Sequence, residues 1–163
     1  MSNVKGTISL GNGFAVVGVF DNAQKIAKNF TLKEYANNLA KENIQFEITD
    51  DALEHIKMLQ ELRNKCGSLT VNSWYRTAKF NRSVNGSSNS LHLKGLATDI
   101  SFRAMSDGQY LKIKLAWKDI CKAHGKIGGI NRYTNGVHVS SREDLLGAKS
   151  FVERDYRRKA GDW

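Results

Sequence analysis

The sequence predicts an α+β fold in which helices pack on a small antiparallel sheet. Two observations predict it. Several segments begin with a helix-capping residue and continue with apolar residues at helical spacing, and short β-branched or aromatic runs lie between turn-forming residues. The 163 residues fit a single domain that is large enough to bury a core without disulfides.

The N-terminal part predicts a β-hairpin and a first helix. Residues 7–20 contain two β-rich runs around Asn12-Gly13, a pair that favours a hairpin turn. We interpret residues 1–29 as a hairpin extension and residues 30–163 as the main domain. Thr31 and Glu34 have the spacing of a capping box, and the apolar positions after them predict a helix that ends near Asn43.

The rest of the chain predicts further helices and strands. Capping residues and glycines delimit one helix from Thr49 to Gly67 and another from Ser106 to Gly125. Strands are expected at 69–75, 96–102 and 137–139, the last after a glycine-bearing segment at 127–133 and an Asn135-Gly136 turn. Residues 77–89 are rich in Asn, Ser and Gly and predict a loop, and residues 142–159 predict a basic final helix.

The composition narrows the classes of partner. Lys and Arg outnumber Asp and Glu by 25 to 16, and the net charge of +9 favours a polyanion. Nucleic acid and the anionic polymers of a bacterial wall both fit. The basic residues are scattered and no recognised nucleic-acid motif is present, which disfavours nucleic acid.

The sequence predicts neither an export signal nor a disulfide. The longest apolar run, Phe14 to Phe20, is too short to span a bilayer and lacks the flanks of a secretory signal. Cys66 and Cys121 have no paired spacing, so we expect both to be free thiols. The sequence therefore predicts a protein made in the cytoplasm without a signal peptide and without a membrane span.

The histidines indicate a metal site. Of the four, His92 and His138 fall on a strand-edge loop and a strand, whereas His55 falls mid-helix among residues expected to face solvent. Asp99 lies on the strand that follows His92. Two neutral imidazoles and one carboxylate leave a fourth zinc position open, as a catalytic zinc requires.

Three stretches of the chain carry a resemblance to a known family. They are Ser73-Trp74-Tyr75-Arg76-Thr77, the run from Asn89 to Ile100 with its S-x-H-x-x-G-x-A-x-D core, and Gly128 to Tyr133 followed by Val137-His138-Val139. Together they resemble the zinc D-alanyl-D-alanine carboxypeptidases and their phage L-alanyl-D-glutamate endopeptidase relatives, which have the hedgehog/DD-peptidase fold. The likeness covers about Phe30 to Ser141.

The resemblance implies roles for particular residues. His92, Asp99 and His138 match the ligands of one zinc ion, and Arg76 matches the arginine that anchors substrate and stabilises the oxyanion. Ser90 and Tyr75 are candidates for contacts with the substrate. The implied substrate is the D-amino-acid-containing stem peptide of peptidoglycan.

The general base departs from the family pattern. The acidic residue three positions before the last histidine ligand is replaced by Asn135, and the one two positions after it by Ser140. Neither an amide nor an unassisted hydroxyl accepts a proton near neutral pH. Three other candidates lie elsewhere in the sequence: Glu143, Asp144 and His124.

Three functional hypotheses follow. The first is a zinc metallopeptidase of peptidoglycan, of the kind made by a phage or prophage, that acts on the cell wall after release or is carried in a virion. The second keeps the zinc site without turnover, as a wall-binding or virion structural protein. The third and least favoured is a basic nucleic-acid-binding protein that uses the C-terminal helix, with Trp74 and Tyr75 stacking on bases.

Overall fold

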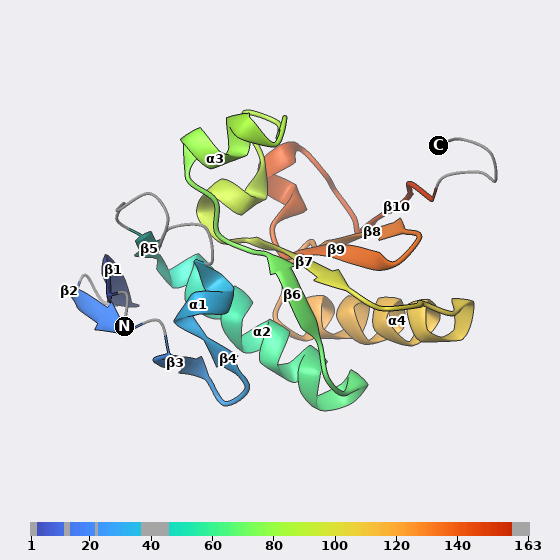
Figure 1. Ribbon diagram of the computed structural model, residues 1–163. Coiled ribbons are helices and arrows are strands. Elements are labelled where there is room, and N and C mark those ends of the chain that lie inside the picture. Colours follow the sequence, from blue (N-terminus) through green and yellow to red (C-terminus); the bar gives the residue numbers. More distant parts are fainter. Residues whose placement is uncertain (1–2, 12–13, 22, 37–45, 158–163) are drawn as a thin grey trace.

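A five-stranded sheet forms the centre of the computed structural model, which describes residues 3–11, 14–21, 23–36 and 46–157. Its strand order is β10-β8-β9-β7-β6. The strands are β6 (Thr70–Ser73), β7 (Ala97–Ser101), β8 (Gly129–Tyr133), β9 (Gly136–Ser140) and β10 (Val152–Asp155). The helices α2 (Asp50–Cys66) and α4 (Asp107–Ala123) cover one side, and α3 (Ala78–Ser83) lies on the other (Figure 1). The predicted α+β class is confirmed.

The two long helices begin and end where the capping residues predict. The side chains of Thr49 and Ser106 accept hydrogen bonds from backbone N–H groups in the first turns of α2 and α4. Beyond the helix ends, Gly67 and Gly125 have positive φ angles of 85° and 65°. These local signals were sufficient to place both helices.

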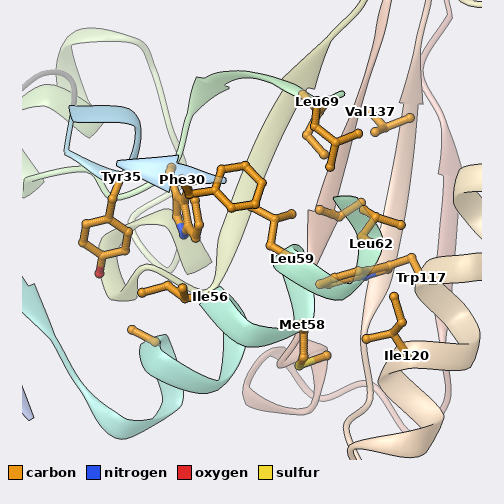
Figure 2. Close-up of a cluster of buried hydrophobic side chains, with 14 of the residues drawn as sticks. Phe30, Tyr35, Ile56, Met58, Leu59, Leu62, Leu69, Trp117, Ile120 and Val137 are labelled. Atoms are coloured by element: carbon orange, nitrogen blue, oxygen red, sulfur yellow. The ribbon is translucent and has the colours of Figure 1, made fainter. Parts of the chain in front are cut away.

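The core lies between these helices and one face of the sheet. Figure 2 shows side chains of α2 and α4 meeting those of the sheet and of the N-terminal segment. Trp117 of α4 is fully buried and donates from its indole N–H to the Ser140 carbonyl oxygen at 3.0 Å. Strand residues that point into this core alternate with residues on the opposite face, as a half-covered sheet requires. Those pointing inward include Ile100, Ile130, Val137 and Val139.

The opposite face carries a row of polar residues that crosses every strand. Cross-strand register pairs each member with the next one along the row. Residues in register on neighbouring strands point to the same face. From β6 to β10 the row is Ser73, Asp99, His138, Asn131 and Arg154. We call it the polar row.

The N-terminal hairpin forms a second sheet. Strands β1 (Asn3–Gly11) and β2 (Phe14–Asp21) pair antiparallel, which confirms the hairpin, although the turn at residues 12–13 lies outside the described residues. β5 (Phe46–Ile48) pairs parallel with β1. A short pair, β3 (Lys25–Ala27) and β4 (Phe30–Thr31), leads into the main sheet region. The boundary at residue 29 stays a prediction.

The first helix is shorter in the described residues than its pattern predicts. The capping box between Thr31 and Glu34 is present, so the predicted start is correct. The helix α1 spans Leu32–Tyr35 and ends at Ala36, whose backbone is no longer helical. The remainder of the predicted span, up to Asn43, falls within residues 37–45 and outside the described residues.

Two predictions of local structure were wrong. The predicted loop at 77–89 contains α3, which Thr77 caps by accepting a hydrogen bond from the Phe80 N–H. The predicted basic helix at 142–159 is instead a 3₁₀ turn (Glu143–Leu146), ended by Gly147 at a φ of 91°, and then β10. Because β10 pairs parallel with β8, the sheet is mixed rather than wholly antiparallel. Residues 158 and 159 of the predicted helix lie outside the described residues.

His55 is buried rather than solvent-facing, which corrects the prediction for this residue. Its ring nitrogens hydrogen-bond to Ser141 Oγ at 2.8 Å and Thr98 Oγ1 at 2.9 Å. The ring packs edge-on between Trp74 and Trp117. Burial, together with repulsion from His92 and His138, lowers the pKa of His55 to about 3.

The structure also bears on the cysteines and on membrane-spanning helices. Cys66 and Cys121 are free thiols, as their spacing predicts. In the part of the chain that is described, no helix has the length and apolar character needed to cross a bilayer.

The buried His55 predicts a pH dependence of folding. Its pKa is about 6.5 when unfolded and about 3 when folded, so between these values the unfolded chain binds a proton that the folded chain does not. Stability is therefore unaffected by His55 above pH about 6.5 and falls as the pH drops, by up to about 1.4 kcal/mol per unit. We expect a His55→Gln variant of the metal-free protein to have a shallower slope between pH 6 and 4, measured by urea unfolding. Equal slopes in the two proteins would contradict this assignment.

Candidate metal centre

His92 is held on the 3₁₀ helix η2 (Leu91–Lys94), which Ser90 caps by accepting a hydrogen bond from the His92 N–H at 3.3 Å. The imidazole is almost fully buried, and its Nδ1 lies 2.7 Å from the carbonyl oxygen of Trp74. A carbonyl oxygen can only accept, so Nδ1 carries the proton. This bond leaves Nε2 as the nitrogen with a lone pair for a metal.

Gly95 explains why a glycine follows His92 in the motif. It ends η2 with a φ of 70°, and a Cβ atom there would lie 2.3 Å from the Tyr35 hydroxyl oxygen. Both the backbone conformation and the close approach exclude a larger residue. Gly95 therefore turns the chain from His92 into β7, the strand that carries Asp99.

Asp99 and His138 face each other across β7 and β9. They are register partners, and His138 Nδ1 lies 2.8 Å from Asp99 Oδ1. His92 Nε2 lies 3.2 Å from Asp99 Oδ2. One ligand atom from each of these three residues lies within 4.8 Å of the other two, and in the described residues this is the group of His, Cys, Asp and Glu side chains that could hold a metal ion.

Arg76 joins the same cluster from the end of β6. Its Nη2 donates to Asp99 Oδ2 at 3.0 Å, and its Nε donates to Ser73 Oγ at 3.0 Å. The Arg76 backbone N–H also donates to the His92 carbonyl oxygen at 2.9 Å. These bonds fix the guanidinium beside the three candidate ligands, and they use only part of its five N–H donors.

The electrostatics of the cluster favour the ionisation states that bind a metal. Burial alone would raise the pKa of Asp99, but its close contacts with His138 and His92 outweigh burial and hold this pKa well below its usual value. Burial also lowers the pKa of His92, against the attraction of Asp99. Near neutral pH the pair is therefore a carboxylate and a neutral imidazole, which are the forms that coordinate metals.

The donor set fits zinc. Zinc in proteins takes nitrogen and oxygen ligands at about 2.0–2.2 Å in tetrahedral geometry, which places ligand atoms roughly 3.3–3.6 Å apart. His92 Nε2 lies 3.2 Å from Asp99 Oδ2, and the ligand atoms of all three residues lie within 4.8 Å of one another, so small side-chain rotations would suffice. With three protein ligands, one position stays open for water or substrate.

A hollow of about 350 Å³ borders this cluster. Asp99 and Ser101 of β7 form part of its lining, and Tyr133, Asn135 and Gly136 close it at the β8–β9 turn. Asn135 thus lies beside the candidate site, in the place where the family pattern has a carboxylate. Space for a substrate exists next to Asp99.

The two predicted substrate contacts have different positions. Ser90 supports the loop through its bond to the His92 N–H. Tyr75 is half-buried and stacks on Tyr35 with ring centroids 5.6 Å apart. Tyr75 lines a second hollow, of about 280 Å³, together with Leu93 and Lys94 rather than the hollow beside Asp99.

Two of the three candidate bases, His124 and Asp144, are paired with other residues away from the metal cluster. His124 pairs with Glu54 and Glu61 of α2, and this contact raises its pKa; it lies on the helical side of the sheet, not with the metal cluster. Asp144 is held by Arg142, with Nη2 to Oδ2 at 3.0 Å. None of these partners is a candidate metal ligand, so neither His124 nor Asp144 is held at the metal cluster.

Glu143 alone of these candidates lies on the face of the polar row. Its Oε1 accepts from Ser140 Oγ at 2.7 Å, and Ser140 shares a face of β9 with His138 because the two are separated by one residue. A Cβ added at Gly129, the register partner of Ser140, would lie 3.0 Å from the same oxygen. The carboxylate is buried, and its Oε2 has no hydrogen-bond partner among the described residues.

Three groups of the site have no clear signal in the sequence. The Trp74 carbonyl that orients His92 is a backbone group and leaves no trace in side-chain identity. Asn131 and Arg154 belong to the polar row, but only strand register reveals this, and the sequence predicts a helix at Arg154. The alternation of Asn131 with the buried Ile130 was the available clue.

The nucleic-acid hypothesis loses two of its supports, the stacking by Trp74 and the basic helix. Trp74 is 0% exposed, with its indole N–H donating to the Gly95 carbonyl oxygen at 3.2 Å, so it cannot stack on a base. The basic C-terminal helix is absent from the described residues up to 157.

Comparison with known families agrees with the geometry. The family model described as Peptidase M15 matches residues 28–140, well over half of the chain, and the matched segment contains Arg76, His92, Asp99 and His138. No curated protein matches the chain.

The cluster predicts one zinc ion per chain. We expect isothermal titration of the metal-free protein with Zn²⁺ to give one tight site, because three preorganised donors converge there. His92→Ala should weaken it by at least about tenfold through loss of a donor. His124→Ala is the matched control, since it removes a histidine on the other side of the sheet and should bind as wild type does. A second tight site, or equal loss in both variants, would contradict the assignment.

Proposed function

Because the chain belongs to the peptidase M15 family, we propose that it is a zinc-dependent metallopeptidase that hydrolyses peptide bonds next to D-amino acids in bacterial peptidoglycan. The observation that carries the proposal is the convergence of His92, Asp99 and His138, whose ligand atoms lie within 4.8 Å of one another beside a hollow of about 350 Å³.

The zinc ion and Arg76 would have different roles in hydrolysis. A zinc ion held there would lower the pKa of a water molecule to about 7 and polarise a peptide carbonyl. Arg76 would donate to the carbonyl oxygen as negative charge develops on it, because a guanidinium stays charged at any working pH. The bonds of Arg76 to Ser73 and Asp99 hold the guanidinium in place before substrate arrives.

Glu143 is the proposed general base. Among the three candidate bases it is the one that lies on the face of His138, and its Oε1 accepts from Ser140, the residue that replaces the acid of the family pattern. At the position of the family's acid, β9 has the hydroxyl of Ser140. The bond from this hydroxyl holds the carboxylate of Glu143, which comes from the 3₁₀ turn after β9, next to that position. Its buried, unpaired Oε2 is the atom that would accept the proton.

The wall is the proposed place of action. The net charge of +9 favours adsorption to anionic wall polymers. A phage or prophage lytic enzyme, released at the end of infection or carried in a virion, fits the family resemblance of the motif.

The second candidate is a wall-binding or virion structural protein that keeps the zinc site without turnover. The replacement of both expected acids by Asn135 and Ser140 favours it. Hydrolysis of peptidoglycan peptides by the purified protein distinguishes the peptidase from this binding protein.

Hydrolysis under metal control is the first expected outcome. Purified zinc-loaded protein should release new amino groups from peptidoglycan fragments, measured by amine derivatisation and mass spectrometry. Chelation should abolish release and added zinc should restore it. Absence of any released amine with the metal site saturated would overturn the peptidase and leave the binding protein.

Glu143→Gln should lower kcat by at least about a hundredfold while zinc binding is unchanged, because an amide keeps the acceptor for Ser140 but cannot take a proton. Asp144→Asn is the matched control, one residue away and bound to Arg142, and should retain kcat within about threefold. If both variants turn over like wild type, the base is another group.

A further inference from the structure

Arg154 is the outermost member of the polar row. It is the register partner of Asn131 on β8, which is in turn the register partner of His138. Its Nη1 donates to Asn131 Oδ1 at 3.4 Å, so the guanidinium leans across β8 toward the metal cluster. Arg154 and Arg76 therefore approach the candidate site from opposite edges of the same sheet face.

The charge of Arg154 is weakly neutralised. Its nearest carboxylate oxygen is Glu143 Oε1 at 3.8 Å, and the side chain is 42% exposed. By comparison, Arg76 and Arg142 have carboxylate oxygens at 3.0 and 2.9 Å and are far less exposed. A guanidinium with long contacts and exposed N–H groups retains the capacity to bind another carboxylate.

Two tyrosines lie on the same face, because each follows a member of the polar row by two residues: Tyr133 follows Asn131, and Tyr156 follows Arg154. Tyr133 and Tyr156 stack with ring centroids 5.6 Å apart, and they are 42% and 52% exposed. Tyr133 also lines the hollow that contains Asp99. The pair thus extends the floor of that hollow toward β10 as an exposed aromatic platform.

We propose that Arg154, supported by Asn131 and flanked by the Tyr133–Tyr156 pair, is a subsite that binds a carboxylate of the substrate peptide. This rests on the proposed peptidase function. Strands lie about 4.8 Å apart and an extended peptide advances about 3.3 Å per residue, so the subsite takes a carboxylate about two to three residues from the bond that is cut.

A peptidoglycan-type stem peptide offers two carboxylates of this kind, a side group and the chain terminus. The probe is L-Ala-γ-D-Glu-L-Lys-D-Ala-D-Ala in three forms: unmodified, with the D-Glu α-carboxylate converted to an amide, and with the C-terminal carboxylate converted to an amide. Amidation removes the charge and keeps the shape. The form whose amidation weakens recognition identifies the carboxylate that Arg154 binds.

Recognition is measured on zinc-loaded protein as kcat/KM if wild type cleaves the peptides, and as Kd by calorimetry if it does not. We expect one amidation to cost wild type about tenfold, the size of a charge-assisted contact. In Arg154→Gln the free and amidated forms should be recognised equally. Any effect of the variant on nearby Glu143 is common to all three peptides and cancels in the ratio.

Arg157→Gln is the matched control, because Arg157 pairs with Asp155 on the opposite face of β10 and should leave the preference intact. Zinc stoichiometry reports that each variant is folded. The subsite is overturned if Arg154→Gln keeps the wild-type preference, if it weakens all three peptides equally, or if wild type shows no preference. Lack of cleavage with a preference still seen in Kd would instead overturn the peptidase and leave the subsite standing.

Discussion

The shared carboxylate of Asp99 is the interaction on which the rest of the site depends. His92, His138 and Arg76 reach it from three separate elements, at 3.2, 2.8 and 3.0 Å. A largely buried carboxylate is costly unless it is well hydrogen-bonded. The hydrogen bonds from His138 and Arg76 offset this cost, and the convergence of the three side chains on Asp99 also brings together the groups that a metal would use.

The sheet makes this convergence possible. Asp99 and His138 meet because β7 and β9 pair in one register, and a shift of either strand by one residue would turn that strand's side chain into the core. The same register places Asn131 and Arg154 further along the row. On the opposite face, Val137 and Val139 pack against helices α2 and α4, so burial of the apolar face fixes the order of the polar face. His55, bonded to Thr98 and Ser141, ties α2 to the strand ends beside the site.

Much of this arrangement could be predicted from the sequence where the signal is local. Thr49 and Ser106 predict the long helices, and the motif around His92 and Asp99, through its resemblance to a zinc peptidase family, predicts the candidate metal cluster. Non-local properties could not be predicted in this way. The segment around Arg154 has helix-compatible composition, yet pairing with β8 makes it a strand, and the burial of His55 depends on strands far away in sequence. The short α3 was missed because its polar composition resembled a loop.

The central claim is that His92, Asp99 and His138 bind one zinc ion with a position left open. Anomalous diffraction at the zinc absorption edge, on crystals of the zinc-loaded protein, tests this most directly. The account predicts a single anomalous peak about 2.0–2.2 Å from one atom of each residue, with His92 bound through Nε2 and a fourth position facing the hollow that Tyr133 lines. A peak at another site, such as His124 with Glu54 and Glu61, or a fourth protein ligand that closes the coordination, would contradict it.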